Sequence, residues 1–207
     1  MKWYDIFSNF YDNSLEKLYF DSRQRAIELL DLKPDQNILD IACGTGANFF
    51  HIKNSEKSIK IFGTDFSEGM LRKCKNNISK NNWNDIYVFQ EDAQLLSPEI
   101  VEKHLGTPKK FNNIICVLGL SVIPNWETVL NNMLNLLQEN GKILIVDVFA
   151  EKRDFNTWLV EKIAKADLNR KIWQTLELKT NSFYQEYLPI KESKVGGKLF
   201  VAVGTKK

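Results

Sequence analysis

Short apolar runs and longer amphipathic segments alternate along most of this chain. The apolar runs predict strands at residues 37–41, 60–66, 85–92, 111–119 and 142–149. Between several of them, apolar side chains recur every three or four positions, which predicts helices at 45–53, after Ser67 and at 126–138. Asn140-Gly141 is predicted to end the last of these helices. Strands that alternate with helices in this way are typical of a mostly parallel sheet with helices on both faces.

The two ends of the chain extend this pattern. Residues 3–20 are rich in aromatic side chains and fit helical spacing only in part, and a further helix is predicted at 22–32. Near the other end, a helix at 154–168 carries four large apolar side chains on one face: Phe155, Trp158, Leu159 and Ile163. Two more strands follow at 182–189 and 198–206, and their short separation predicts an antiparallel hairpin. The prediction is an α/β fold with a seven-stranded sheet.

Composition and charge fit one globular domain and remove several classes of function. The chain has 207 residues, enough for one domain with a full hydrophobic core. Of these residues 43% are hydrophobic and 26% charged, as in ordinary globular proteins. A net charge of +2 gives no electrostatic argument for nucleic acid. The three cysteines, Cys43, Cys74 and Cys116, lack metal-like spacing and are interpreted as buried thiols. Without an apolar run of membrane-spanning length or a signal peptide, a cytoplasmic protein is expected, although contact with a membrane surface stays open.

The first predicted strand ends in a glycine-containing corner, ILDIACGTGANFF, at residues 38–50. Asp40 lies in the strand, and Gly44 and Gly46 allow a sharp turn and close approach of a ligand to the backbone. Amides of the following helix point into the crevice at the carboxyl ends of the strands, where sheets of this class bind ligands. Taken alone, the corner also fits a turn that merely packs helix on strand.

Two carboxylates after the next strands favour a nucleoside-binding site. Asp65 ends the second strand, 19 residues after Gly46, where a carboxylate can accept hydrogen bonds from both hydroxyls of an adenosine ribose. It could instead be a helix N-terminal charge, because the helix that Ser67 can cap begins just after it. Asp92 follows the third strand, where it can accept from an adenine amino group or serve as an ordinary loop acid, and Ala93 leaves the backbone accessible.

Three segments, DIACGTG at 40–46, GTDFSEGML at 63–71 and EDA at 91–93, together resemble the first three motifs of class I S-adenosylmethionine-dependent methyltransferases. The resemblance covers about residues 36–150 and includes the C-terminal hairpin. Phe49 stands where a dinucleotide site would need a third glycine, which counts against NAD and FAD. The family fold implied is a Rossmann-like sheet in a single domain, 1–207, with an N-terminal helical lid at 1–32, a cofactor-binding core at 36–150, and a C-terminal helix and hairpin at 151–207.

The resemblance implies that the cofactor is S-adenosylmethionine and that the product is S-adenosylhomocysteine. It also implies a cofactor-binding role for each matched residue. Gly44 and Gly46 would line the methionine part, while Asp40 would orient the loop and reach the amino group directly or through water. Asp65 would hold the ribose, with Asp92 at the adenine edge. The residues implied to bind the cofactor are Tyr11, Asp40, Ala42, Cys43, Gly44, Thr45, Gly46, Asp65, Phe66, Met70, Asp92, Ala93, Val117 and Leu118.

The N-terminal segment WYDIFSNFYD resembles the helical cover of ubiquinone-type and phospholipid-type methyltransferases. Tyr11 matches the tyrosine that faces the cofactor in such covers, and it is the one candidate for a catalytic role. Aromatic faces attract a methyl-sulfonium by cation–π interaction, by about 0.5–2 kcal/mol each. The neighbouring aromatics also fit a helix that packs on the core. Further aromatics that could line an acceptor pocket or simply pack are Trp158, Trp173, Phe183 and Tyr184.

Residue types that are absent from the expected site limit the class of reaction. A sulfonium is already a strong methyl donor, so the protein mainly aligns a nucleophile and excludes water. Ser121 and Val122 stand where many small-molecule relatives carry histidines, and His51 and His104 are interpreted as structural or surface residues. No acid ends the fourth strand as metal-dependent relatives need, so no metal is predicted.

The expected activity is therefore metal-independent methyl transfer to an amine, thiol or activated carbon of a small molecule or lipid headgroup. No nucleic-acid partner and no integral membrane contact are expected, and the oligomeric state is left open. Two alternatives stay open as well: a non-catalytic cofactor-binding or regulatory module of the same fold, and an RNA methyltransferase.

Overall fold

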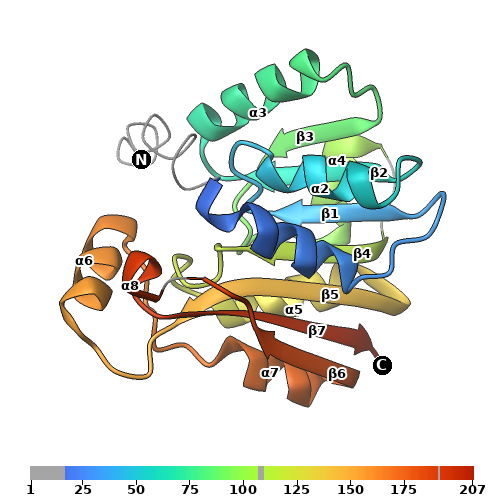
Figure 1. Ribbon diagram of the computed structural model, residues 1–207. Coiled ribbons are helices and arrows are strands. Elements are labelled where there is room, and N and C mark those ends of the chain that lie inside the picture. Colours follow the sequence, from blue (N-terminus) through green and yellow to red (C-terminus); the bar gives the residue numbers. More distant parts are fainter. Residues whose placement is uncertain (1–16, 107–109, 191) are drawn as a thin grey trace.

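The computed structural model describes residues 17–106, 110–190 and 192–207, and a seven-stranded sheet runs through them (Figure 1). Its strand order is β3-β2-β1-β4-β5-β7-β6. The strands are β1 (Asn37–Ile41), β2 (Lys60–Asp65), β3 (Ile86–Gln90), β4 (Phe111–Val117), β5 (Leu137–Phe149), β6 (Thr180–Tyr187) and β7 (Lys198–Lys206). Strands β1 to β5 pair in parallel, and β7 is antiparallel to both β5 and β6. The predicted mostly parallel sheet with an antiparallel C-terminal hairpin is confirmed.

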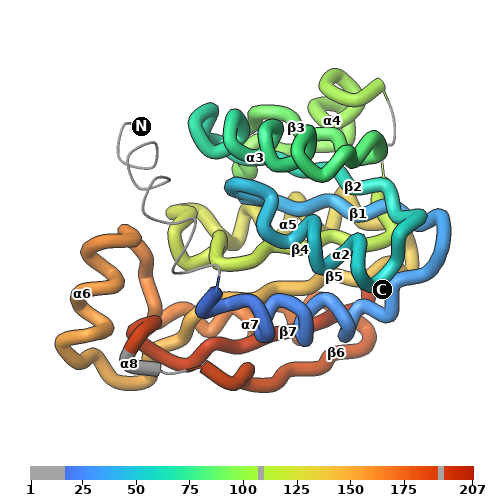
Figure 2. The backbone as a smooth tube through the Cα atoms, turned by 45° about the horizontal axis from the view of Figure 1, so that its top comes forward, coloured from blue at the N-terminus to red at the C-terminus, as the bar shows by residue number. Residues whose placement is uncertain are grey.

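Helices cover both faces of this sheet. The described helices are 17–28, α2 (Ala47–Ser55), α3 (Glu68–Lys80), α4 (Pro98–Leu105), α5 (Trp126–Leu136), α6 (Phe155–Ala164), α7 (Ile172–Lys179) and α8 (Glu192–Val195). In Figure 1, helix 17–28 and α2 lie in front of the sheet, and α4 and α5 lie behind it. Figures 1 and 2 both show α6 and α8 together at the end of the molecule toward which the parallel strands point.

Side chains that alternate along each strand fill two separate cores, one on each face of the sheet. In β1, Ile38 joins the core beneath helix 17–28, α2 and α3, whereas Leu39 joins the core beneath α4, α5 and α7. In β4, Ile115 and Ile114 divide in the same way. Because both faces are covered, the strands have continuous apolar runs rather than alternating polarity. Asp40, two residues after Ile38, consequently faces the first core.

Several element boundaries differ from those predicted. Helix 17–28 ends four residues before the predicted end at 32, and Asp31 has a left-handed φ of 50°. The helix predicted to run to 168 ends at Ala164, where Lys165 is left-handed with φ 54°. Asn140-Gly141 was predicted to end a helix, but it lies inside β5, which begins at Leu137. Asn140 has φ 59°, and the pairing register between β4 and β5 shifts at this point.

Three helices of the described chain, α4, α7 and α8, were not predicted. The signals for α4 are present in the sequence, because Ser97 caps it, Pro98 occupies its first turn and Gly106 ends it. The Ser97 hydroxyl oxygen accepts a hydrogen bond from the backbone N–H of Ile100 at 3.3 Å. Helix α7 has no side-chain cap, and its buried pair Ile172 and Leu176 is too short a pattern to predict a helix. All three cysteines are buried, as predicted.

Two neighbouring side chains leave no room for a Cβ at position 46, so glycine is required there. It has φ 83°, and a Cβ placed there would lie 2.8 Å from the Phe49 ring and 2.9 Å from the sulfur of Cys74. Phe49 and Cys74 are both fully enclosed in the first core. Gly106 also has a left-handed φ, 70°, but a Cβ there would meet no atom within 4 Å.

We therefore expect Gly46→Ala to destabilise the protein by about 1–3 kcal/mol more than Gly106→Ala, because only the first adds overpacking to the left-handed strain that both share. Denaturant unfolding of the two variants and the wild-type protein measures the difference. Equal losses at the two positions would show that contact with Phe49 and Cys74 does not select glycine at position 46.

Candidate active site

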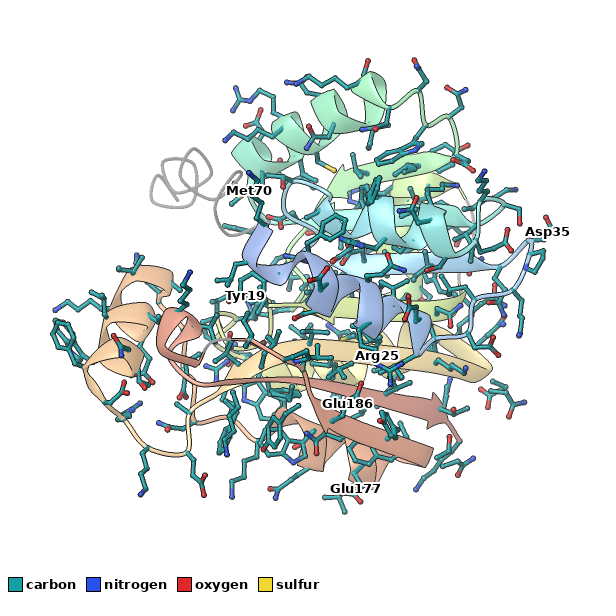
Figure 3. The ribbon with its side chains drawn as sticks, viewed as in Figure 1. Tyr19, Arg25, Asp35, Met70, Glu177 and Glu186 are labelled. Carbon is teal, nitrogen blue, oxygen red and sulfur yellow. The ribbon has the colours of Figure 1, made fainter. Side chains whose placement is uncertain are left out.

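A cavity of about 410 Å³ opens at the carboxyl ends of the parallel strands. Residues that follow β1, β2 and β3 form one part of its wall, and residues from the β4–α5 loop, the end of β5 and α6 form the other. This is the edge at which doubly wound sheets bind ligands, and the volume lies in the range of small-molecule sites. In Figure 3, Tyr19 on helix 17–28 and Met70 on α3 lie at this same end of the molecule.

The corner after β1 leaves its backbone open to the cavity. Gly44 has φ 56°, and a Cβ placed on it would meet no atom within 4 Å. Ala42, also on the cavity wall, has the same left-handed φ of 56°, and Leu118 after β4 has φ 59°. Left-handed backbone at residues other than glycine is strained and concentrates at functional sites. The chain thus turns sharply at the ends of both β1 and β4, which are neighbours in the sheet.

Asp65 connects the ends of β1 and β2. Its carboxylate accepts one hydrogen bond from the backbone N–H of Gly44 at 2.9 Å and another from that of Ser67 at 2.8 Å. Burial raises the pKa of Asp65, while these two N–H groups act in the opposite direction. The Ser67 hydroxyl oxygen accepts from the backbone N–H of Met70, as the predicted cap requires. Asp65 therefore fixes the backbone of the glycine corner and also holds Ser67, the residue that caps α3.

Asp92 lies on the cavity wall after β3. Its carboxylate accepts from both the backbone and the side-chain amide of Gln94, and Ala93 beside it is buried. The Gln94 side-chain oxygen accepts in turn from Asn125, which precedes α5. The loop after β3 is thereby tied to the segment after β4.

Asp40 does not reach the cavity wall. It is completely buried beneath helix 17–28 and α2, where one carboxylate oxygen accepts from the Asn48 side chain at 2.9 Å and the other has no hydrogen-bond partner. Asn48 itself lines the cavity and also accepts from Arg23 of helix 17–28. Burial raises the pKa of Asp40 to about 7. Direct contact between Asp40 and a ligand, one of the two predicted possibilities, is therefore not available in this geometry.

The remaining predicted residues divide into three groups. Gly46 does not line the cavity, because its neighbours are Phe49 and Cys74. Tyr11 lies outside the described residues. The predicted residues that do line the cavity are Ala42, Cys43, Gly44, Thr45, Asp65, Phe66, Met70, Asp92, Ala93, Val117 and Leu118.

Several polar groups on the cavity wall were not predicted, among them Asn48, Arg23 and Asp147. Arg23 is a buried guanidinium with its carbon 6.0 Å from the centre of the Tyr19 ring, and its Nε has no hydrogen-bond partner. Asp147, near the end of β5, is also buried, and its oxygens accept from the backbone N–H groups of Ser121 and Val148. An acid inside the apolar run ILIVDVF was the available signal for Asp147, whereas only the three-dimensional placement of helix 17–28 identifies Arg23.

The wall beyond Asp147 is mainly apolar. Arg170 holds the β4–α5 loop in place by donating to the backbone carbonyls of Leu120 and Ile123, each at 2.6 Å. Neither histidine lines the cavity: His51 is buried against Phe20 and His104 stacks on Phe89. Four of the aromatics considered earlier are also absent from this wall, namely Trp158, Trp173, Phe183 and Tyr184. The apolar residues of this part are Val117, Leu118, Val122, Ile123, Pro124, Val148, Val160, Ala164, Ala166, Leu168 and Val195.

Neither a metal site nor a membrane-spanning helix is found among the described residues. No group of three or more histidine, cysteine or acidic side chains there is arranged to hold a metal ion. None of the helices that the structure describes has the length and apolarity needed to cross a bilayer.

A family model described as a methyltransferase domain matches residues 32–193 of this chain. A demethylmenaquinone methyltransferase from Desulfitobacterium hafniense (strain Y51) is 23% identical over 148 residues, which are 71% of this chain and 54% of that protein. A demethylmenaquinone methyltransferase from Bacillus mycoides (strain KBAB4) is 24% identical over 60% of this chain and 50% of its own length. The chain thus spans about half the length of these curated relatives.

Solved structures share the fold at low sequence identity. Phosphoethanolamine N-methyltransferase 2 from Haemonchus contortus, in complex with phosphomonomethylethanolamine and S-adenosylhomocysteine, has a TM-score of 0.73 at 14% identity, over 98% of this chain and 57% of that chain. A SAM-dependent methyltransferase from Aquifex aeolicus has a TM-score of 0.66 at 13% identity, over 98% of both chains.

The burial of Asp40 gives a test of this geometry through pH. Because the folded-state pKa of about 7 exceeds the ordinary value of 3.8, the folded protein keeps a proton that the unfolded chain has lost, and stability falls as pH rises from about 4 to 7. In the Asp40→Asn variant, the side chain at position 40 is an amide that cannot ionise. The free energy of unfolding of this variant, minus that of the wild-type protein, should increase by about 2–4 kcal/mol across this interval.

Denaturant unfolding at several pH values between 4 and 8 measures this difference. Burial lowers the pKa of His51 to about 4, which gives stability an opposite pH dependence, but that contribution is common to both proteins and cancels in the subtraction. A difference that does not change with pH would contradict the buried, protonated state of Asp40.

Proposed function

This chain belongs to the methyltransferase domain family, and on that premise we propose that it transfers a methyl group from S-adenosylmethionine to a small apolar or lipid-like acceptor. The observation that carries the proposal is that one cavity joins the wall of Gly44, Asp65 and Asp92 to an apolar wall behind the β4–α5 loop. A donor site and an acceptor site that share one cavity satisfy the proximity that a direct displacement needs.

The residues on the first wall suit the cofactor. Open space at Gly44 would accept the methionine part, and the Asp65 carboxylate, already oriented by two backbone N–H groups, would accept from the ribose hydroxyls. Phe66, with 54% of its surface exposed, and Met70 would pack against the adenine, while Asp92 would border its edge.

Helix 17–28 supplies the charge for the amino-acid end of the cofactor. Arg23 is the cationic side chain on that part of the described wall and would pair with the methionine carboxylate. Asp40 acts through Asn48: it accepts from the Asn48 amide and so holds the side chain that would meet the cofactor. Asp40 is accordingly a positioning residue in this proposal.

When bound, the cofactor would supply an electrophilic methyl group, and the chain's own residues would orient the acceptor and exclude water. Asp147 already accepts from two backbone N–H groups, so its role would be to fix the loop at Ser121 rather than to remove a proton. Aliphatic side chains on the acceptor wall exclude water, which favours apolar acceptors over charged ones. A nucleophile whose proton leaves readily, such as an amine, a thiol or the activated carbon of an aromatic ring, suits such a site.

Gly44 allows a matched test of where the cofactor binds. Gly44→Ala and Gly106→Ala both place a Cβ on a left-handed backbone with no protein atom within 4 Å. Each should therefore lower stability by a similar amount, about 1–2 kcal/mol. Only Gly44→Ala should weaken S-adenosylhomocysteine binding, by about tenfold or more, because its Cβ would take up ligand space. Calorimetric titration measures this, and an unchanged dissociation constant for Gly44→Ala would remove the cofactor from this corner.

The acceptor class is tested by transfer of a labelled methyl group from S-adenosylmethionine. We expect incorporation into quinol-type, thiol or amine acceptors with long apolar substituents, and at least about tenfold less into water-soluble amines of the same reactivity, since desolvation of polar groups opposes their binding. Cofactor binding without transfer to any of these would support the non-catalytic alternative. Transfer to RNA alone would support the RNA methyltransferase alternative.

A further inference from the structure

Helix α6 presents an apolar outer face to solvent. Phe155 is 72% exposed, Trp158 50% and Leu159 39%, although each is a side chain that folded proteins usually bury. They follow helical spacing, so they form one stripe, and the Phe155 and Trp158 rings stack with their centres 5.8 Å apart. The large apolar side chains that the sequence placed on one face of this helix thus face outward.

The opposite face of α6 belongs to the proposed acceptor site. Thr157 is buried and donates to the backbone carbonyl of Gly196 at 2.8 Å, and a Cβ at Gly196 would press against Val160. Val160 and Ala164 line the cavity. A single helix, about 10 Å thick, therefore separates the exposed stripe from the space proposed for the acceptor.

Charges around α6 leave Lys162 beside the stripe and Lys152 exposed just before the helix. The carboxylates of this segment are engaged: Asp154 caps the helix, Glu161 pairs with Arg153 at 3.1 Å and Glu151 lies 3.6 Å from Lys198. Lys152 and Lys162 are exposed, and the Lys162 ammonium lies 5.3 Å from the centre of the Trp158 ring. Exposed aromatics flanked by lysines are the composition of helices that lie in a membrane interface.

We propose that α6 docks the protein on an anionic lipid bilayer, with Phe155, Trp158 and Leu159 inserted among the lipids and Lys152 and Lys162 at the headgroups. This inference rests on the proposed function, because it explains how a lipid-like acceptor reaches the cavity without crossing water. An interfacial helix is buried to a depth of about 5–10 Å, so the Val160 side of α6 and the cavity stay at the bilayer surface. Figures 1 and 2 show α6 at an end of the molecule, away from the main sheet, where contact with a flat surface is sterically possible.

The lysines distinguish this partner from a second copy of the chain. A self-associating face would bring Lys152 and Lys162 of two molecules toward each other and create repulsion, whereas anionic headgroups attract them. The bilayer is therefore the occupant whose charge complements this face.

The test is flotation of the full chain with phosphatidylcholine vesicles that contain or lack phosphatidylglycerol, with no cofactor present. We expect binding to the anionic vesicles, reduced by about tenfold or more in the double variant Phe155→Ala/Trp158→Ala. The control is Leu178→Ala on α7, which removes a side chain that is 79% exposed at a different site and should leave binding unchanged. Lys152→Glu/Lys162→Glu should weaken binding to anionic vesicles by a comparable factor, whereas Lys57→Glu, at an exposed position between α2 and β2, should not.

Any of five results would overturn the inference. Three concern vesicle binding by the aromatic site: no binding to anionic vesicles, no loss in Phe155→Ala/Trp158→Ala, or an equal loss in Leu178→Ala. The other two are no loss in the lysine variant and a dimer in sedimentation equilibrium that Phe155→Ala/Trp158→Ala dissociates. Melting temperature and circular dichroism check that each variant is folded. Titration with S-adenosylhomocysteine separates this inference from the function on which it rests. Cofactor binding without vesicle binding overturns only the docking of α6, whereas vesicle binding without cofactor binding overturns the proposed function.

Discussion

The Asp65 carboxylate holds together the two strand ends on which the rest of the site depends. It accepts hydrogen bonds from the backbone N–H groups of Gly44, after β1, and of Ser67, before α3. These donors belong to the glycine corner and to the cap of the next helix, so one side chain fixes the direction of both turns. Two charge-assisted hydrogen bonds of this kind stabilise a fixed geometry by about 1.5–3 kcal/mol each. The open space at Gly44 and the orientation of α3 follow from this one group.

Features that repeat along the chain were predictable, and features that depend on one tertiary contact were not. Apolar strands such as β1 and β4 are buried on both faces, so their sequences predicted them directly. Ser67 and its helix followed from local capping chemistry. Asn140-Gly141 misled because a left-handed turn has the same composition at a helix end and inside an irregular strand. Helix α6 shows another limit: the sequence identified its stripe of large apolar residues but not the side that the stripe faces. Thr157, Val160 and Ala164 face the protein instead.

At the site, sequence could identify which positions belong to the corner but not what each one contacts. Gly44 and Gly46 look equivalent in the sequence, yet one opens on the cavity and the other on Phe49 and Cys74. Asp40 lies two residues after Ile38 in β1, on the same face of the sheet, and is therefore covered by helix 17–28 and α2 rather than open to a ligand. Arg23 comes from a helix far from the motifs in sequence, so only the packing of that helix over β1 brings it to the cavity wall.

The position of β7 in the sheet has a consequence for the order in which the protein can be built. β7 lies between β5 and β6 and pairs with both, although it is the last of the three to be synthesised. Until residues 198–206 leave the ribosome, one long edge of β5 has no partner and β6 has no sheet to join. The C-terminal part of this fold therefore forms in one late step, during which the apolar edge of β5 needs protection from other nascent chains.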